Sequence, residues 1–223
     1  MKKKILTIKE LIKSAREFCI LESIQTCDEL FGITDGKAVG TFMEKKIKNY
    51  LLTNFKVQIG NSASGIDLPG DNINTDIKVT SIKQPQSSCP FKNVYQKIYG
   101  LGYNILLFVY DKKDDLKLKK SNMIFVDCSF IEKSRTADYQ ITSALIQLLN
   151  NKANVDDIFA FLIDKNIPAD EITLINLAKE ILNNPPQIGY LTISNALQWR
   201  LQYSRIVALS EDISGITKIV ERS

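Results

Sequence analysis

An unbroken apolar segment constrains the fold of this chain more than any other feature. Residues 104–110 read Asn-Ile-Leu-Leu-Phe-Val-Tyr, with no charged side chain among them. A strand that is apolar at every position, rather than at alternate positions, is typical of a central strand covered on both faces. Residues 123–128, Met-Ile-Phe-Val-Asp-Cys, predict a further strand. The chain is therefore expected to form a sheet with other elements packed against it.

Apolar residues recur at helical spacing before and after these strands. Residues 5–31 predict one or two amphipathic helices, residues 37–54 predict a long helix, and residues 93–101 predict a short one. A short alternating strand is predicted at 55–59. From Thr136 onward the pattern is helical, with candidate helices at 139–150, 154–165, 169–182 and 194–209. Strands and helices mixed in this way predict an α/β protein with a mostly helical C-terminal region.

Two acidic segments precede the apolar run. Asp67 is followed by the turn-forming Pro69-Gly70-Asp71, and Asp76-Ile77-Lys78 then opens a β-branched run. Side chains two apart on a strand share a face, so Asp76 and Lys78 should project together while Ile77 enters the core. A hairpin-like return from Asp67 would bring a second carboxylate beside the first. Such a group suits a hard divalent cation that binds phosphate oxygens. The alternative is a surface hairpin with ordinary charged residues.

The helix predicted at 37–54 carries a carboxylate among its apolar residues. Glu44 lies three residues before Ile47 and seven before Leu51, on the buried side of an otherwise basic helix. A carboxylate in that position needs a partner or a function. Either Glu44 lies at the edge of the apolar stripe and pairs with Lys48 at i,i+4, or it is an inward functional carboxylate. The sequence leaves both interpretations open.

The composition restricts the chemistry that the chain can carry out. The absence of histidine excludes histidine general bases, His-dependent nucleophiles and His-ligated zinc. The four cysteines form no C-x-x-C pair, and we expect reduced, mostly buried thiols. The net charge of +4 is mildly basic, which is compatible with a polyanionic partner. Any catalysis would therefore depend on carboxylates and lysine.

The sequence predicts no membrane segment. The basic start of the chain imitates a signal peptide, but Lys9, Glu10 and Lys13 interrupt the segment that follows. No window approaches the ~18 apolar residues that a membrane-spanning helix needs. We expect a soluble protein of the cytoplasm.

The two acidic segments together resemble a known catalytic motif. Asp67, a spacer of eight residues and then Asp76-Ile77-Lys78 are similar to the core of the PD-(D/E)XK nucleases, which include many type II restriction endonucleases. The resemblance spans residues 37 to about 128, where the expected order of helix, three strands, helix and strand matches that core. Ile66 departs from the pattern, which has a proline before the first aspartate.

The resemblance implies a fold and a division of the chain. The fold would be a restriction-endonuclease-like α/β core, a mixed central sheet flanked by helices, followed by the mostly helical C-terminal region. Residues 1–36 would form an N-terminal helical segment, and residues 37–135 the catalytic core. Residues 136–223 would form the helical C-terminal region, which is a candidate for DNA binding.

The resemblance also implies a role for each residue of the motif. Asp67 and Asp76 would hold Mg²⁺, and the backbone carbonyl of Ile77 could add a ligand. Lys78 would steer the attacking water and offset charge on the phosphate. The first helix of such cores often carries an additional glutamate, here Glu44, which would bind a second metal or orient a metal-bound water. The implied reaction is phosphodiester hydrolysis that leaves a 5′-phosphate and a 3′-hydroxyl.

Two polar regions are candidates for contacts with double-stranded DNA. The loop predicted at 81–92 directly follows the catalytic strand, although a plain polar connector is the alternative. The helix predicted at 194–209 combines basic, amide and aromatic side chains, and short helices around 183–189 could form a helix-turn-helix-like unit with it. Trp199 and Tyr203 in that helix are expected to be core residues. The candidate DNA-binding residues are Lys83, Gln84, Gln86, Ser87, Ser88, Lys92, Asn93, Arg200 and Arg205.

The function expected from this resemblance is that of a Mg²⁺-dependent, site-specific endonuclease of the restriction type. Cleavage of both strands of a duplex by one site per subunit favours a homodimer. One alternative is a catalytically silent nucleic-acid-binding or regulatory protein with a nuclease-like fold. Another is a repair or resolvase-type nuclease with the same core.

Overall fold

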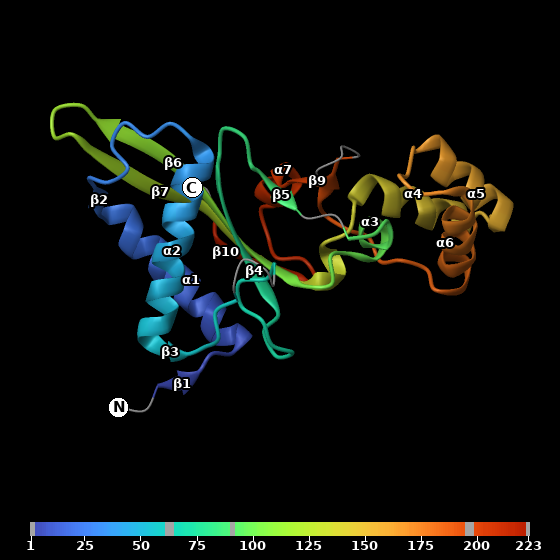
Figure 1. Cartoon of the computed structure of the whole chain (residues 1–223), viewed down its shortest axis with the longest axis horizontal. Helices are drawn as coiled ribbons and strands as arrows, with labels where there is room; N and C mark the ends of the chain where they lie inside the picture. Colours follow the sequence, from blue (N-terminus) through green and yellow to red (C-terminus); the bar gives the residue numbers. More distant parts are fainter. Residues whose placement is uncertain (1–2, 61–64, 90–91, 195–198, 222–223) are drawn as a thin grey trace. The chain divides into compact units, whose positions relative to one another are not determined.

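The computed structural model describes residues 3–60, 65–89, 92–194 and 199–221 (Figure 1). These residues belong to two compact units. The first consists of residues 1–87, 103–131 and 207–223, and the second of residues 88–102 and 132–206. Both ends of the chain join the unit that contains Asp67 and Asp76, so each unit is made of separate segments of the chain. The division into residues 1–36, 37–135 and 136–223 stays a prediction.

A mixed sheet forms the centre of the first unit. Its strand order is β10-β7-β6-β4, and β2 pairs with β7 beyond this path. The last strand, β4, runs parallel to β6, whereas β7 is antiparallel to both β6 and β10. The strands are β4 (Thr75–Ser81), β6 (Asn104–Asp115), β7 (Lys120–Ile131), β10 (Ile216–Val220) and β2 (Thr26–Cys27).

The unbroken apolar segment forms an inner strand of this sheet, as the sequence predicts. It belongs to β6, and its side chains from Ile105 to Val109 are completely buried. An interior position on both faces explains why no polar side chain interrupts the run. The prediction of a mixed central sheet flanked by helices is confirmed for this unit.

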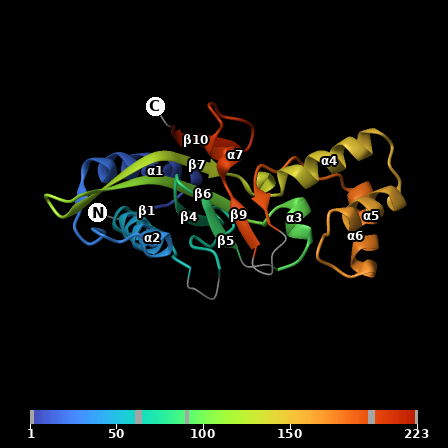
Figure 2. The same cartoon turned by 90° about the horizontal axis from the view of Figure 1, so that it is seen from above.

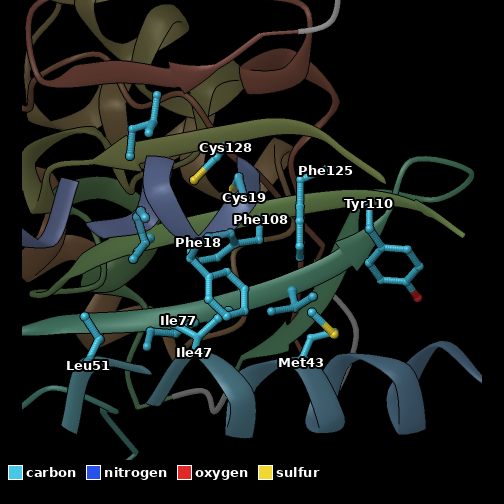
Figure 3. Packing of buried hydrophobic residues seen from close by; sticks show 14 of the residues in the cluster. Phe18, Cys19, Met43, Ile47, Leu51, Ile77, Phe108, Tyr110, Phe125 and Cys128 are labelled. Carbon is cyan, nitrogen blue, oxygen red and sulfur yellow. The ribbon is translucent and has the colours of Figure 1, made fainter. Parts of the chain in front are cut away.

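Two long helices pack against the sheet of the first unit (Figures 1 and 2). Helix α1 (Ile8–Ile24) begins with a capping box between Thr7 and Glu10, and α2 (Gly36–Asn54) begins at the N-cap Asp35. Phe18 of α1, Met43 of α2 and Phe108 of β6 belong to one buried cluster (Figure 3). Burial of this apolar surface fixes the helices on the sheet.

The segment predicted as a first strand contributes little to the sheet. Only Phe55–Lys56 (β3) is extended in a ladder, and it pairs in parallel with Lys4–Ile5 (β1), apart from the main sheet. Residues 5–31 form one helix, α1, followed by the short strand β2, rather than a second helix.

The charged segment 111–120 is mostly strand rather than a turn. Residues Asp111–Asp115 extend β6, and their pairing with β7 continues as far as Asp115 opposite Lys120. The ion pairs of Lys112 with Asp114 and of Lys113 with Asp111 join residues two apart on one face of the strand. A two-stranded ribbon exposed to water needs no alternation of apolar and polar residues. The sequence of this segment therefore does not show the periodicity of a strand.

Helices dominate the second unit. Its elements are α3 (Tyr95–Tyr99), a 3-10 turn (Lys133–Arg135), α4 (Tyr139–Asn150), α5 (Val155–Asp164), α6 (Glu171–Asn183), β8 (Thr192–Ile193), β9 (Trp199–Gln202) and α7 (Ser204–Val207). The cores of α3 to α6 meet in one cluster that includes Ile98, Leu145, Leu162 and Leu177. The sequence predicted these helices to within two residues at either end of α4, α5 and α6.

The prediction of a helix at 194–209 is wrong. Residues Trp199–Gln202 form β9, which pairs with β8, and only Ser204–Val207 is helical. Trp199 and Leu201 point inward while Arg200 and Gln202 are exposed, the alternation of a strand. Trp199 and Tyr203 are nearly or fully buried, which confirms that they are core residues. Gln198 lies outside the described residues.

Two further expectations about this part of the chain are contradicted. Residues 184–190 contain no helix, so there is no helix-turn-helix-like unit around 183–189. The loop predicted at 81–92 contains the strand β5 (Gln86–Cys89).

None of the helices in the described ranges is long and apolar enough to cross a membrane.

Candidate active site

A single bridge places Asp67 beside β4. The backbone N–H of Leu68 donates to Thr75 O at 2.9 Å, and that of Thr75 donates back to Leu68 O at 3.0 Å. Gly70 makes the intervening turn with φ +124°, a conformation that other residues rarely adopt. Asp67 therefore precedes an isolated bridge rather than standing on a regular strand, but the return of the chain that the sequence suggested does occur.

The two aspartates meet through the backbone of β4. The N–H of Ile77 donates to Asp67 Oδ2 at 2.9 Å, which holds the Asp67 carboxylate against the strand that carries Asp76. Asp76 is 4% exposed, and Lys78 Nζ lies 2.7 Å from its Oδ2. The side chain of Ile77 is completely buried in the core. This is the strand alternation expected from the sequence, at the β4 end of the sheet.

Helix α2 brings Glu44 into the same electrostatic environment. Gly40 allows the close approach of this helix to β4, because a Cβ there would lie 3.1 Å from Val79 O. Burial is the main reason that the pKa of Glu44 rises to about 7; the charges of Asp67 and Asp76 act in the same direction, and Lys78 and Lys48 oppose the shift. Glu44 is thus half-buried within the influence of these charges, which agrees with the inward interpretation, and its role in a functional site stays a prediction.

Lys48 does not serve as a simple surface partner of Glu44. Its Nζ lies 2.5 Å from Asp67 Oδ1, and both side chains are largely buried. The sequence analysis considered Lys48 only as an i,i+4 partner of Glu44. This spacing places both side chains on the same face of α2, and it was the one sequence signal that Lys48 faces the acidic residues. Its ion pair with Asp67 depends on the turn at Gly70, which no local pattern reveals.

The two aspartates differ in their affinity for protons. The pKa of Asp76 rises to about 6, mainly because of burial; Lys78 opposes this shift and the Asp67 carboxyl adds to it. Burial also acts to raise the pKa of Asp67, but Lys48 and the Ile77 N–H outweigh it and lower the pKa. Burial thus favours the protonated forms of Glu44 and Asp76, whereas its partners keep Asp67 ionised.

The donor set fits a hard divalent cation. Mg²⁺ is typically bound by one or two carboxylates and retains several waters, so Asp67 and Asp76 are sufficient protein ligands. Within the described residues, no group of three or more acidic or cysteine side chains forms a ready-made metal cage. Glu44 stays a candidate either for binding a second metal ion or for orienting a metal-bound water.

The candidate DNA-binding residues of the first unit lie close to this strand. Lys83 and Gln84 are exposed in the turn that follows β4, whereas Gln86 and Ser87 are partly buried in β5. Thr80 of β4 binds this turn, since its hydroxyl donates to Gln86 O at 3.0 Å and accepts from the Gln86 N–H at 3.1 Å. The turn is thereby fixed to the strand that carries Asp76.

The other candidate DNA-binding residues belong to the second unit. Ser88, Lys92, Asn93 and Arg200 are exposed. Arg205 is partly buried, and its guanidinium carbon lies 3.6 Å from the centroid of the Tyr139 ring. The sequence did not single out Tyr139, whose ring attracts the Arg205 guanidinium through a cation–π interaction.

Comparison with known proteins identifies the family. The sequence model of the family described as "Type II restriction enzyme NspV" matches residues 5–218. The chain belongs to this family. The type II restriction enzyme NspV of Nostoc sp. is 50% identical to it over 215 residues, which cover 96% of this chain and 97% of the relative. No solved structure matches the chain.

Membership of the NspV family confirms the resemblance to a type II restriction endonuclease. The match at residues 5–218 includes residues of both compact units. The assignment of a restriction-endonuclease-like core stays a prediction, because it depends on the motif and the order of elements.

Proposed function

We propose that this protein is a Mg²⁺-dependent endonuclease that hydrolyses phosphodiester bonds of double-stranded DNA at a specific site. Asp67, Asp76, Lys78 and Glu44 would form its active site. One observation carries the proposal in this chain of the NspV family. The Ile77 N–H binds the Asp67 carboxylate next to Asp76, and Asp76 is paired with Lys78.

The carboxylates of Asp67 and Asp76 would hold the metal, with the carbonyl of Ile77 as a candidate further ligand. A bound Mg²⁺ would supply charge stabilisation at the phosphate and acidify a water molecule. Burial of Asp76 excludes competing water from its carboxylate, which strengthens its electrostatic interactions.

Lys78 and Glu44 would act on the substrate and on the proton of the attacking water. The Lys78 ammonium is held near Asp76 and can donate to a phosphate oxygen as charge develops there. Glu44 has a pKa of about 7, so its carboxyl can accept a proton near neutral pH and release it again.

Contacts with DNA would come from both units. In the first unit the candidates are Lys83, Gln84, Gln86 and Ser87, which follow β4. In the second unit they are Ser88, Lys92, Asn93, Arg200 and Arg205. The guanidinium of Arg205 lies over the Tyr139 ring, and its donors would contact a phosphate or a base edge. The Arg205 Nε has no hydrogen-bond partner among the described residues.

The assembly and location belong to the same proposal. An enzyme that cuts both strands of a duplex with one site per chain would act as a homodimer. Because its substrate is DNA, we infer that it acts in the cytoplasm.

Incubation of the purified protein with plasmid DNA and Mg²⁺ tests the proposed function. Discrete fragments are expected for the wild type, and no cleavage is expected for Asp76→Asn, which preserves the shape of the side chain. Absence of cleavage of any DNA with any divalent metal would contradict the proposal. For a binding protein without catalysis, the wild type and the Asp76→Asn variant would bind DNA with the same affinity, and neither would cleave it.

A further inference from the structure

The positively charged partner of Asp67 is a lysine from outside the predicted motif. Lys48 lies on α2, one turn after Glu44, and its ammonium is 2.5 Å from Asp67 Oδ1. The other oxygen, Oδ2, accepts the Ile77 N–H at 2.9 Å. Both oxygens of this carboxylate therefore already have partners within the chain.

This arrangement opposes the binding of a metal ion at Asp67. The side chains of Lys48 and Asp67 are 23% and 19% exposed, so water screens their attraction only in part. A dication that binds Asp67 Oδ1 would have to approach the same oxygen as the ammonium, where the two like charges repel each other. Movement of the Lys48 side chain would relieve this repulsion, whereas the backbone donor Ile77 would stay in place.

Lys48 differs in this respect from Lys78. Lys78 pairs with Asp76 from two residues further along the same strand, as expected for the lysine of the motif. Lys48 is contributed by the helix that carries Glu44, so it links α2 directly to the turn before β4.

We propose that Lys48 is the internal counter-ion of Asp67 and that a divalent cation must displace it to bind. Lys48 is thus a positioning residue that keeps the metal affinity of the DNA-free enzyme low. The inference rests on the proposed function, because it takes Asp67 as a metal ligand.

Titration of the DNA-free protein with Mn²⁺, followed by electron paramagnetic resonance of the free ion, tests this role. Mn²⁺ takes the same oxygen ligands as Mg²⁺. Lys48→Met removes the charge and keeps an unbranched side chain, and it should bind Mn²⁺ about 10-fold more tightly or better. Lys48→Arg retains the charge and should bind as weakly as the wild type. Lys45→Met removes an exposed lysine from the same helix and should leave the affinity unchanged.

A purely structural lysine would give the opposite result. If Lys48 only held Asp67 in place, Lys48→Met would bind Mn²⁺ more weakly than the wild type or with equal affinity, and either outcome overturns the inference. Lys48→Gln is a second variant in case Lys48→Met does not fold, as judged by circular dichroism.

Failure of the inference can be distinguished from failure of the proposed function. Asp67→Ala should lose Mn²⁺ binding if Asp67 is a ligand. Suppose that the wild type binds Mn²⁺, that Asp67→Ala abolishes this binding and that Lys48→Met does not strengthen it. This result would overturn the inference and leave the proposed function intact. Absence of Mn²⁺ binding in every variant, together with absence of plasmid cleavage, would overturn both.

Discussion

Three carboxyl groups in one site respond differently to protons, because each has a different balance of burial and neighbouring charge. Glu44 and Asp76 have raised pKa values of about 7 and about 6, while Lys48 and a backbone donor keep the pKa of Asp67 low. Burial is the largest cause of both raised pKa values, and neighbouring carboxylates add to it. Predictions about single residues follow from this charge balance.

Glu44→Gln should stabilise the metal-free protein at high pH. Folded Glu44 keeps its proton to about pH 7, whereas the unfolded chain loses it near the ordinary value of 4.5. Its ionisation therefore reduces stability as the pH rises from about 4.5 to about 7. The measurement is the melting temperature of Glu44→Gln minus that of the wild type, in the presence of a chelator. This difference should be larger by several degrees at pH 8 than at pH 5. Glu211→Gln, at an exposed glutamate, is the control, and equal differences at both pH values would contradict the prediction.

Lys78→Ala should slow the chemical step by about 10²-fold or more and leave DNA binding nearly unchanged. The reason is that the ammonium acts on charge that develops only as the phosphodiester breaks. Single-turnover cleavage rates and filter binding measure the two quantities separately. An equal loss in both measurements would mean that Lys78 serves in DNA binding rather than in catalysis.

At the scale of elements, the contact between α2 and β4 determines whether Glu44 reaches the site. Gly40 lies one turn before Glu44, at a position where an added Cβ would lie 3.1 Å from the Val79 carbonyl oxygen. Close packing transmits small displacements along a rigid helix. The separation of these two elements therefore controls the geometry of the acidic site.

Gly40→Ala should lower the cleavage rate by about 10-fold while changing stability little. The added Cβ would lie 3.1 Å from Val79 O, so the helix must shift by a few tenths of an ångström, and small misplacements of catalytic groups are costly. The better helix propensity of alanine, about 1 kcal/mol, offsets the lost packing. Gly36→Ala in the same helix has no atom within 4 Å of the new Cβ and should cleave normally. Similar rates for both variants would show that the α2–β4 spacing is unimportant.

At the scale of the whole molecule, two compact units each contain candidate contacts to DNA. The turn after β4 is fixed to that strand through Thr80, whereas Arg200 and Arg205 lie in the second unit with different surroundings. Base contacts and phosphate contacts have different signatures in binding experiments. Substitutions in the two units can therefore show which of them reads the sequence.

Gln84→Ala should weaken binding to the cognate duplex by about 1–3 kcal/mol and leave binding to random DNA unchanged. Arg200→Ala and Arg205→Ala should weaken binding to both duplexes and reduce the salt dependence, as expected for phosphate contacts. Affinities for cognate and random duplexes at two salt concentrations separate these cases. If the arginine variants lose discrimination and Gln84→Ala does not, the second unit reads the sequence instead.

The sequence by itself determined the features that depend on local periodicity. It predicted the helices α4, α5 and α6, the buried strand β6, and the placement of Asp76 and Lys78 on one face of β4. Each of these follows from the repeat of a helix or a strand over neighbouring residues. The motif resemblance was sufficient to indicate a type II restriction endonuclease, which the family match confirms.

Only the tertiary structure decided the contacts between residues far apart in the chain. Lys48 meets Asp67 because a bridge and a glycine turn return the chain to β4. Asp127 and Lys218 form a buried ion pair because β10 completes the sheet beside β7, although the two residues are 91 positions apart. Trp199–Gln202 is a strand because β8 offers it a partner, while its amino acids suit a helix equally well. Pairing and burial of this kind depend on the partner as much as on the segment itself, and no local pattern specifies the partner.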